Sequence, residues 1–134
     1  MTPDSSVVIA AFASWNQHHE AAVEALSQHG VVDLLAHAEL ESYSVLTRLP
    51  EPFRAEPTLV AEYLHSDYPG SRMVLPERER RRLLRRLASL SISGGAVYDA
   101  MAAATATHHG HGLLSCDRRA ASVYSRLDAE VTYL

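Results

Sequence analysis

Short apolar runs alternate along the chain with longer stretches whose apolar residues recur at helical spacing, and this alternation restricts the fold more than any other feature. The clearest apolar run, residues 112–116, is expected to form a buried strand that ends just before Asp117. Alternating strands and helices are typical of a parallel sheet with helices on both faces. The sequence therefore predicts an α/β fold, in which ligands gather at the carboxyl ends of the strands. Further strand candidates are a very short one ending at Asp4 and the runs at residues 31–35, 73–75 and 130–134.

Seven helical patterns lie between these apolar runs. Ser5 and Ser6 can cap the first helix, Pro57 suits the first turn of another, and Gly110 suits the residue after a last turn. The expected helices cover residues 5–12, 18–29, 39–49, 57 towards 69, 76–90, 96–109 and 117–127.

The composition excludes several classes of protein. A length of 134 residues, 47% hydrophobic and 21% charged, fits one folded domain over residues 1–134. All twelve basic residues are arginines, and the absence of lysine excludes Schiff-base chemistry and Walker-type phosphate binding. The single cysteine, Cys116, excludes an internal disulfide and a cysteine-rich zinc module. No apolar run is long enough to cross a bilayer and residues 1–4 lack the basic start of a signal peptide, so we expect a cytoplasmic protein without a membrane partner.

Four acidic residues stand where burial is expected. Asp4 and Asp117 each lie where a predicted strand passes into a helix, so both would point into one cleft. Glu41 and Asp99 lie on helices with mainly apolar neighbours. Two carboxylates about 4 Å apart repel by roughly 4 kcal/mol at an effective dielectric of about 20, so a convergent set must take up protons or bind cations. Oxygen-only ligands favour Mg²⁺ or Mn²⁺, and such a site suits a metal-dependent nuclease.

Each of these acids also has a purely structural interpretation. Asp4 and Asp117 can act as helix N-caps, and Glu41 can be a first-turn acid that complements the helix dipole. Glu39 lies two residues before Glu41, and on a helix the two diverge by about 200°, so only one of them can face the cleft. A structural role is least expected for Asp99, which lies within an alanine-rich helix.

The four acids stand in segments that resemble one family. Residues 4–10, Asp-Ser-Ser-Val-Val-Ile-Ala, are similar to the opening Asp-Thr-Ser segment of PIN-domain ribonucleases, specifically the VapC toxins of bacterial toxin–antitoxin pairs. Residues 41–50, 94–100 and 113–120 resemble the second, third and fourth acidic motifs of that family. The order and spacing agree over nearly the whole chain, and the alignment selects Glu41 rather than Glu39.

The resemblance implies a three-layer α/β/α sandwich with a parallel sheet of four or five strands. It also implies an Mg²⁺- or Mn²⁺-dependent endoribonuclease that forms a homodimer and is inhibited by a VapB-type antitoxin. Its catalytic residues would be Asp4, Glu41, Asp99 and Asp117. Metal ligation would fall to Asp4, Asp99 and Asp117, while Glu41 would bind metal or orient the attacking water. The hydroxyls of Ser6 and Ser115 would support the acids by hydrogen bonds.

Arginines supply the candidate contacts to RNA. An acidic chain that binds a polyanion needs a local basic patch, and the densest one is the helix that carries residues 78–86. The alternative to RNA binding is a solvent-exposed helix face with ion pairs from Glu77 to Arg81 and from Glu79 to Arg82. The opposite face of the helix is apolar and consists of leucines that include Leu84. The possible RNA-binding residues are Arg78, Arg81, Arg82, Arg85, Arg118 and Arg119.

Two other functional classes share part of this pattern. A phosphorelay receiver also carries acids at strand ends, but it needs a lysine that this chain lacks. A catalytically silent PIN-like module that regulates through a protein partner stays open, because the presence of four acids does not show that they converge.

Overall fold

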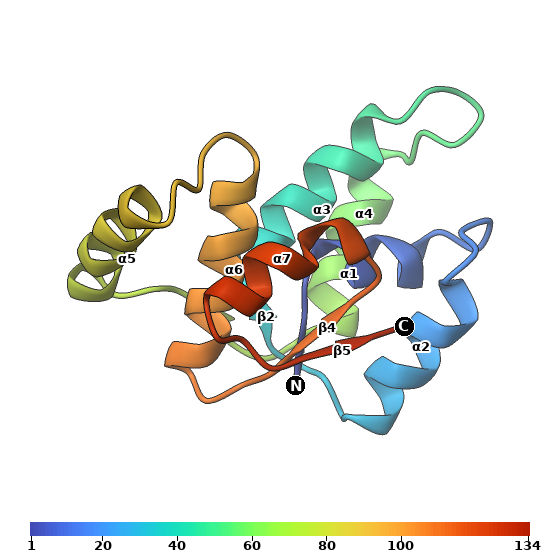
Figure 1. Ribbon diagram of the computed structural model, residues 1–134. Helices are drawn as coiled ribbons and strands as arrows, with labels where there is room; N and C mark the ends of the chain where they lie inside the picture. Colours follow the sequence, from blue (N-terminus) through green and yellow to red (C-terminus); the bar gives the residue numbers. More distant parts are fainter.

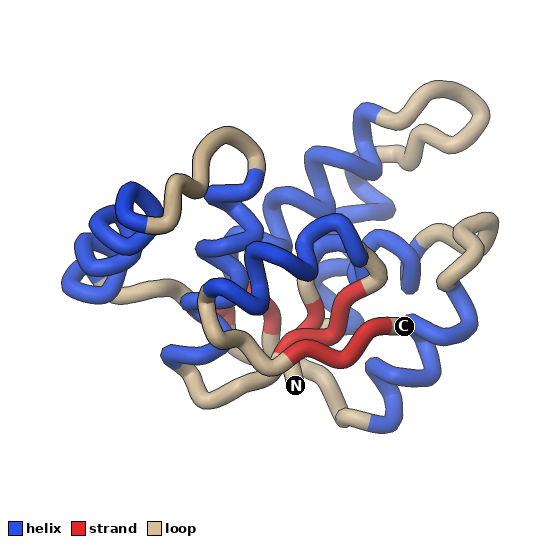
Figure 2. The backbone as a smooth tube through the Cα atoms, viewed as in Figure 1, coloured by secondary structure: helices blue, strands red, loops and turns tan.

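The computed structural model describes all 134 residues and contains five short strands among seven α-helices (Figures 1 and 2). Strands β1 (Thr2–Pro3), β4 (Leu113–Ser115) and β5 (Val131–Tyr133) pair in the order β1-β4-β5, and every pairing is parallel. Strands β2 (Leu34–Leu35) and β3 (Arg72–Met73) form a second parallel pair. Because β2 also lies beside β1, the five strands follow the order β3-β2-β1-β4-β5.

The sandwich has three layers because neighbouring strand residues point to opposite faces. Leu35 and Leu113 enter the largest core cluster, which also holds buried residues of the helices α5 (Glu77–Ser89), α6 (Ala96–His108) and α7 (Ala121–Arg126). Leu34 packs in a second cluster with α1 (Ser5–Phe12), α3 (Ala36–Arg48) and α4 (Pro57–Asp67). Leu114 packs in a third cluster with α1 and α2 (His19–Gln28). The predicted α/β sandwich with a parallel sheet is therefore confirmed.

The helices agree with the predicted positions, with differences at several ends. Asp4, not Ser5 or Ser6, caps the first helix, because its carboxylate accepts a hydrogen bond from Val7 N. The third helix begins at Ala36 rather than residue 39, directly after β2, and the last begins with a 3₁₀ turn, η1. The helices are α1 (Ser5–Phe12), α2 (His19–Gln28), α3 (Ala36–Arg48), α4 (Pro57–Asp67), α5 (Glu77–Ser89), α6 (Ala96–His108), η1 (Arg118–Ala120) and α7 (Ala121–Arg126).

The strands are shorter than the apolar runs that predicted them. The run at residues 31–35 contributes only its last two residues to β2, since Val32 is 46% exposed and Asp33 turns its carboxylate to Ser71 N. On α5 the predicted apolar face is narrower than expected. Leu83 and Leu87 are buried, whereas Leu84 is 69% exposed and does not join the core. None of the helices combines the length and the apolar character that crossing a bilayer requires.

Candidate active site

Four carboxylates border one small cleft at the carboxyl ends of β1 and β4. Asp4 follows β1 and Asp117 follows β4, and parallel strands bring these two ends to the same edge of the sheet. Glu41 on α3 and Asp99 on α6 line the same cleft, which has a volume of about 80 Å³. Figure 1 shows α1, α3, α6 and α7 gathered around these strand ends. The structure therefore brings together all four acids that the sequence analysis selected.

Asp4 is the most buried of the four, with 4% of its surface exposed. Its carboxylate accepts hydrogen bonds from the Ser6 hydroxyl, from Tyr124 Oη at 2.9 Å and from Val7 N at 3.3 Å. Burial raises the pKa of Asp4, and the hydroxyls of Ser115, Ser6 and Tyr124 oppose that rise. Asp4 is thus both a helix cap and a wall of the cleft.

Asp99 lies in a field of negative charge. Burial and the neighbouring carboxylates of Asp117, Glu41 and Asp4 raise its pKa to about 6, while Arg119 has a small opposing effect. No hydrogen bond to the Asp99 carboxylate contributes to this pKa. A carboxyl group in this position favours the uptake of a proton or the binding of a cation.

Asp117 has its own counterion. Arg119 donates from Nε to Oδ1 at 3.0 Å and from Nη2 to Oδ2 at 3.2 Å, and its backbone N–H donates to Oδ1 at 2.9 Å. These contacts lower the pKa of Asp117. Arg119, one of the predicted RNA contacts, therefore lies at the cleft but is engaged with an acid, although its side chain is 92% exposed. Arg118 lies over the ring of Tyr133, 5.1 Å from its centroid.

The structure separates Glu41 from Glu39. Glu41 faces the cleft, with Oε2 3.8 Å from Nε2 of His37. Glu39 points elsewhere and forms an ion pair with Arg72, with Oε1 2.8 Å from Nε. The two residues diverge as their helical spacing requires, and the cleft takes Glu41.

The comparison with protein families agrees with this geometry. The family model of the PIN domain matches residues 1–126. This chain belongs to the PIN-domain family. It is also similar to Ribonuclease VapC40 of Mycobacterium tuberculosis, in strains CDC 1551 / Oshkosh and ATCC 25618 / H37Rv, with 45% identity over 131 residues that cover 98% of this chain and 96% of the relative. Ribonuclease VapC27 of strain ATCC 25618 / H37Rv is 38% identical over 128 residues, covering 96% of this chain and 92% of the relative. Within the PIN-domain family, the chain groups with the VapC ribonucleases.

Two serines tie the strand ends of this PIN domain together. Ser6 donates to Asp4 and accepts a hydrogen bond from Cys116 N at 2.8 Å, which connects α1 to the residue after β4. Ser115 is fully buried and accepts a hydrogen bond from Asp117 N at 3.0 Å. Both hydroxyls therefore lie where they can orient the acids.

Three ring-bearing side chains of the cleft were not predicted from the sequence: Tyr124, His37 and Tyr98. The sequence around Tyr124 on α7 has the apolar spacing of a core residue. Only the packing of α7 against the strand ends shows that the Tyr124 hydroxyl is a partner of Asp4. His37 is a lone histidine at the start of a helix. The nearest sequence signal for Tyr98 is its place directly before Asp99.

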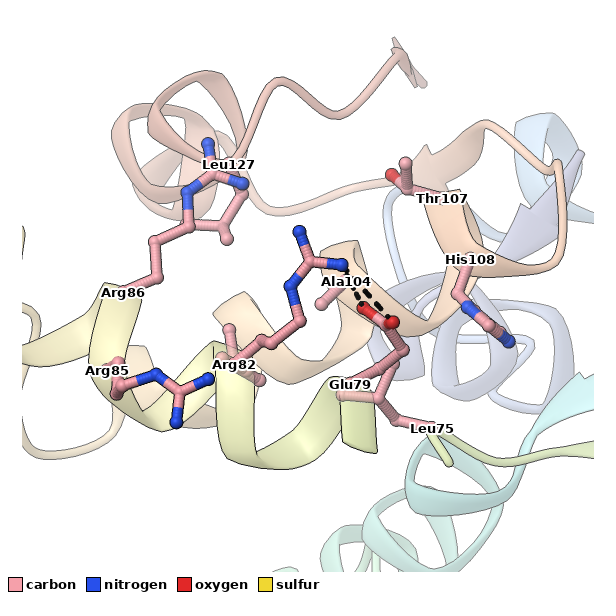
Figure 3. Close-up of a pocket in the computed structure, with 10 residues that line it drawn as sticks. Leu75, Glu79, Arg82, Arg85, Arg86, Ala104, Thr107, His108 and Leu127 are labelled. Carbon is pink, nitrogen blue, oxygen red and sulfur yellow. Dashed lines mark hydrogen bonds and ion pairs between the residues drawn. The ribbon is translucent and has the colours of Figure 1, made fainter. Parts of the chain in front are cut away.

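The arginines of α5 lie apart from the acidic cleft of the PIN domain. Figure 3 shows a second pocket, of about 400 Å³, that is lined by Arg82, Arg85 and Arg86 of α5 and by Thr107 and His108 of α6; Arg82 is directed at Glu79, and Arg86 extends toward Leu127. Arg78, Arg81 and Arg85 line a hollow of about 340 Å³ on the outer side of α5. Neither pocket shares a residue with the cleft.

The predicted ion pairs on α5 are present. Arg81 Nη2 lies 2.7 Å from Glu77 Oε1, and Arg82 Nη1 lies 3.4 Å from Glu79 Oε1. The solvated interpretation of this helix face therefore holds for these two arginines. Neither Arg78 nor Arg85 has an ion pair to an acidic side chain.

The donors in the cleft suit a hard cation in kind, although they do not form a ready-made metal site. No three His, Cys, Asp or Glu side chains lie close enough together to hold a metal ion as they stand. In this arrangement Asp117 turns to Arg119, and three donors hold the Asp4 carboxylate. The donors are all carboxylate oxygens, as Mg²⁺ and Mn²⁺ prefer. Burial is the main cause of the raised pKa of Asp99, and the charges of Asp117, Glu41 and Asp4 that add to it are charges that a divalent cation would neutralise.

Proposed function

We propose that this chain is a divalent-cation-dependent endoribonuclease and the toxin of a type II toxin–antitoxin pair. The observation that carries the proposal is the convergence of Asp4, Glu41, Asp99 and Asp117 on one small cleft. The names of the relatives, Ribonuclease VapC40 and Ribonuclease VapC27, support RNA as the substrate and the VapC group as the functional class. The chemistry of the cleft supports a divalent cation and a role for each acid.

Asp4, Asp99 and Asp117 would hold Mg²⁺ or Mn²⁺. When bound, such a cation lowers the pKa of a water molecule and offsets charge on a phosphodiester. To bind the cation Asp117 would have to leave Arg119, whose side chain is 92% exposed and whose guanidinium would then be available to an RNA phosphate. Glu41 lies at the cleft with a 41% exposed side chain, where its carboxylate would accept a hydrogen bond from the attacking water.

The surrounding hydroxyls keep the acids oriented. Ser6 and Tyr124 donate to different oxygens of Asp4, Oδ1 and Oδ2, and so fix the plane of its carboxylate. Ser115 accepts from Asp117 N and holds the turn that presents this acid. Such support reduces the side-chain motion that ligation would otherwise have to restrict.

RNA would contact the protein beyond the cleft through arginines. The net charge of the chain is −4, so attraction of a polyanion must be local. Arg118 and Arg119 lie beside the cleft, and Arg78, Arg81, Arg82 and Arg85 give α5 a basic surface. A bound strand would use the first pair near the scissile phosphate and the second set for neighbouring phosphates.

A VapB-type antitoxin and a second copy of the chain are the expected protein partners. Exposed apolar side chains support protein contacts: Trp15 and Phe53 are 50% and 45% exposed, and their ring centroids lie 4.7 Å apart. Light scattering of the purified protein measures its molar mass and so tests for the homodimer. A free cysteine and an RNA substrate both support action in the cytoplasm.

The test is RNA cleavage by the purified chain with MgCl₂ or MnCl₂, and with EDTA. We expect cleavage with either cation, none in EDTA, and a loss of at least about 100-fold in Asp99→Asn, which removes one ligand charge. Asp67→Asn makes the same chemical change on an exposed part of α4 and keeps the parental rate. Cleavage that persists in EDTA, or that Asp99→Asn leaves unchanged, contradicts the mechanism. A folded protein that cleaves no RNA with either cation contradicts the nuclease function and favours a silent regulatory module.

A further inference from the structure

Two aromatic rings stack at the edge of the acidic cleft. His37 lies in the first turn of α3, and Tyr98 lies in α6 directly before Asp99. Their ring centroids are 5.0 Å apart and their planes are 9° from parallel. Both residues line the cleft together with the four carboxylates.

The stack is not part of the core. Tyr98 is 52% exposed, and the His37 side chain is 34% exposed. No hydrogen bond fixes the Tyr98 hydroxyl, in contrast to the hydroxyls of Tyr63, Tyr68 and Tyr124. Neither aromatic residue belongs to the hydrophobic clusters, although the partly buried Val97 beside Tyr98 packs against one of them. A half-exposed aromatic ring at a polar cleft has surface available for a further ring.

We propose that His37 and Tyr98 form a nucleobase-binding subsite, on which a base of the RNA stacks beside the scissile phosphate. This inference rests on the proposed function, because it assigns part of that substrate to a place on the protein. The reasoning is electrostatic and geometric. Carboxylates repel the phosphates of RNA, whereas a base is uncharged and presents a π-face to any aromatic ring. Because Tyr98 lines the same cleft as Asp99, a base stacked on its ring lies close to the carboxylates.

The subsite also restricts the form of the RNA. A base that stacks on a protein ring must leave its own helix, so its nucleotide lies in a single strand, a loop or a bulge. Stacking is tolerant of base identity, since every base has a π-face. The structure therefore favours cleavage of unpaired RNA over cleavage within a duplex, and it assigns the positioning of the strand, rather than the chemical step, to the stacked pair.

The experiment compares Tyr98→Leu, which keeps apolar bulk but removes the ring, with Tyr98→Phe, which keeps the ring. Tyr43→Leu is the matched control, because Tyr43 is a 37% exposed tyrosine on α3 that does not line the cleft. The probe is a single-stranded RNA of mixed sequence that the parent protein cleaves, with 2-aminopurine substituted in turn at each position around the cut. The readouts are KM and kcat, the quenching of 2-aminopurine on binding to the Asp99→Asn protein, and thermal unfolding of every variant.

We expect Tyr98→Leu to raise KM by about 5- to 100-fold with a much smaller change in kcat, because stacking stabilises the bound strand and the transition state alike. Tyr98→Phe recovers most of the lost affinity. Quenching should be strongest at one position beside the cut and should disappear when Tyr98→Leu is added. An RNA duplex of the same sequence should be cleaved more slowly than the single strand.

The proposal of a stacking subsite is contradicted if the parent protein cleaves the probe and the Tyr98→Leu variant has the same KM and the same 2-aminopurine quenching as the parent. It is equally wrong if Tyr43→Leu loses as much affinity as Tyr98→Leu, or if kcat falls while KM and quenching stay constant, since that pattern marks a bracing contact between α3 and α6. A parent protein that cleaves no RNA contradicts the proposed function instead, so the two failures can be told apart.

Discussion

Asp99 carries a carboxyl group whose surroundings oppose its charge. Burial and three neighbouring carboxylates raise its pKa to about 6 from an ordinary value of 3.8. The folded protein therefore binds this proton more tightly than the unfolded chain does. The contribution of Asp99 to the free energy of unfolding is constant below about pH 4, falls as the pH rises from about 4 to about 6, and stays low above that range.

Asp99→Asn should consequently stabilise the cation-free protein while removing its activity. The raised pKa of this partly exposed group corresponds, after solvent screening, to about 1 kcal/mol at pH 7.5, or a rise in Tm of about 3–5 °C. Thermal unfolding in EDTA from pH 4 to 8 measures the difference between parent and variant, which should grow up to about pH 6 and then level off. A difference that is independent of pH, or a variant less stable than the parent at pH 7.5, contradicts the charge argument.

The sequence was informative about the acids and, through the family resemblance, about the supporting hydroxyls of Ser6 and Ser115, but it did not indicate two other partners of the acids, Arg119 and Tyr124. Asp4 and Asp117 were found because a strand end fixes where its next side chain lies, and parallel strands share an edge. The ion pair of Arg119 with Asp117 and the hydroxyl of Tyr124 on Asp4 depend instead on how closely η1 and α7 approach the cleft. No local pattern encodes that approach.

Among the elements, α5 shows how far periodicity reaches. The spacing of leucines predicted a helix over residues 76–90, and the structure has α5 at Glu77–Ser89. The same spacing predicted that Leu84 faces the core. In the structure Leu84 is exposed instead, because the neighbouring elements bury only Leu83 and Leu87 of this face. Strand lengths were predicted less well, since two paired residues suffice for β1, β2 and β3 and an apolar run does not show which of its residues pair.

Substitution of two leucines on α5 tests this packing. Leu87 is 6% exposed and Leu84 is 69% exposed. Leu87→Ala removes buried methyl groups and leaves a cavity, so it should lower the free energy of unfolding by about 2–4 kcal/mol. Leu84→Ala should change it by less than about 0.5 kcal/mol. Urea unfolding at pH 7.5 measures both, and equal losses in the two variants would show that α5 packs in a different rotation.

Across the whole molecule, the fold gathers acids from distant parts of the chain. Asp4 and Asp117 are separated by 113 residues but adjoin through the pairing of β1 with β4, while α3 and α6 add Glu41 and Asp99. The largest core cluster and the two smaller ones fix the helices on both faces of the sheet, so the elements that carry the carboxylates cannot move apart to relieve their repulsion. The packing of the sandwich thus keeps the four acidic residues around one cleft despite the repulsion between their negative charges.

The most direct test of this account is calorimetric titration of the cation-free protein with MnCl₂ at pH 7.5, repeated on Asp99→Asn and Asp67→Asn. We predict saturable binding to the parent and to Asp67→Asn, a rise in the Tm of both with added Mn²⁺, and affinity at least about tenfold weaker for Asp99→Asn. Equal binding by Asp99→Asn and the parent, or no binding to either, would contradict the claim that the four carboxylates form a cation site.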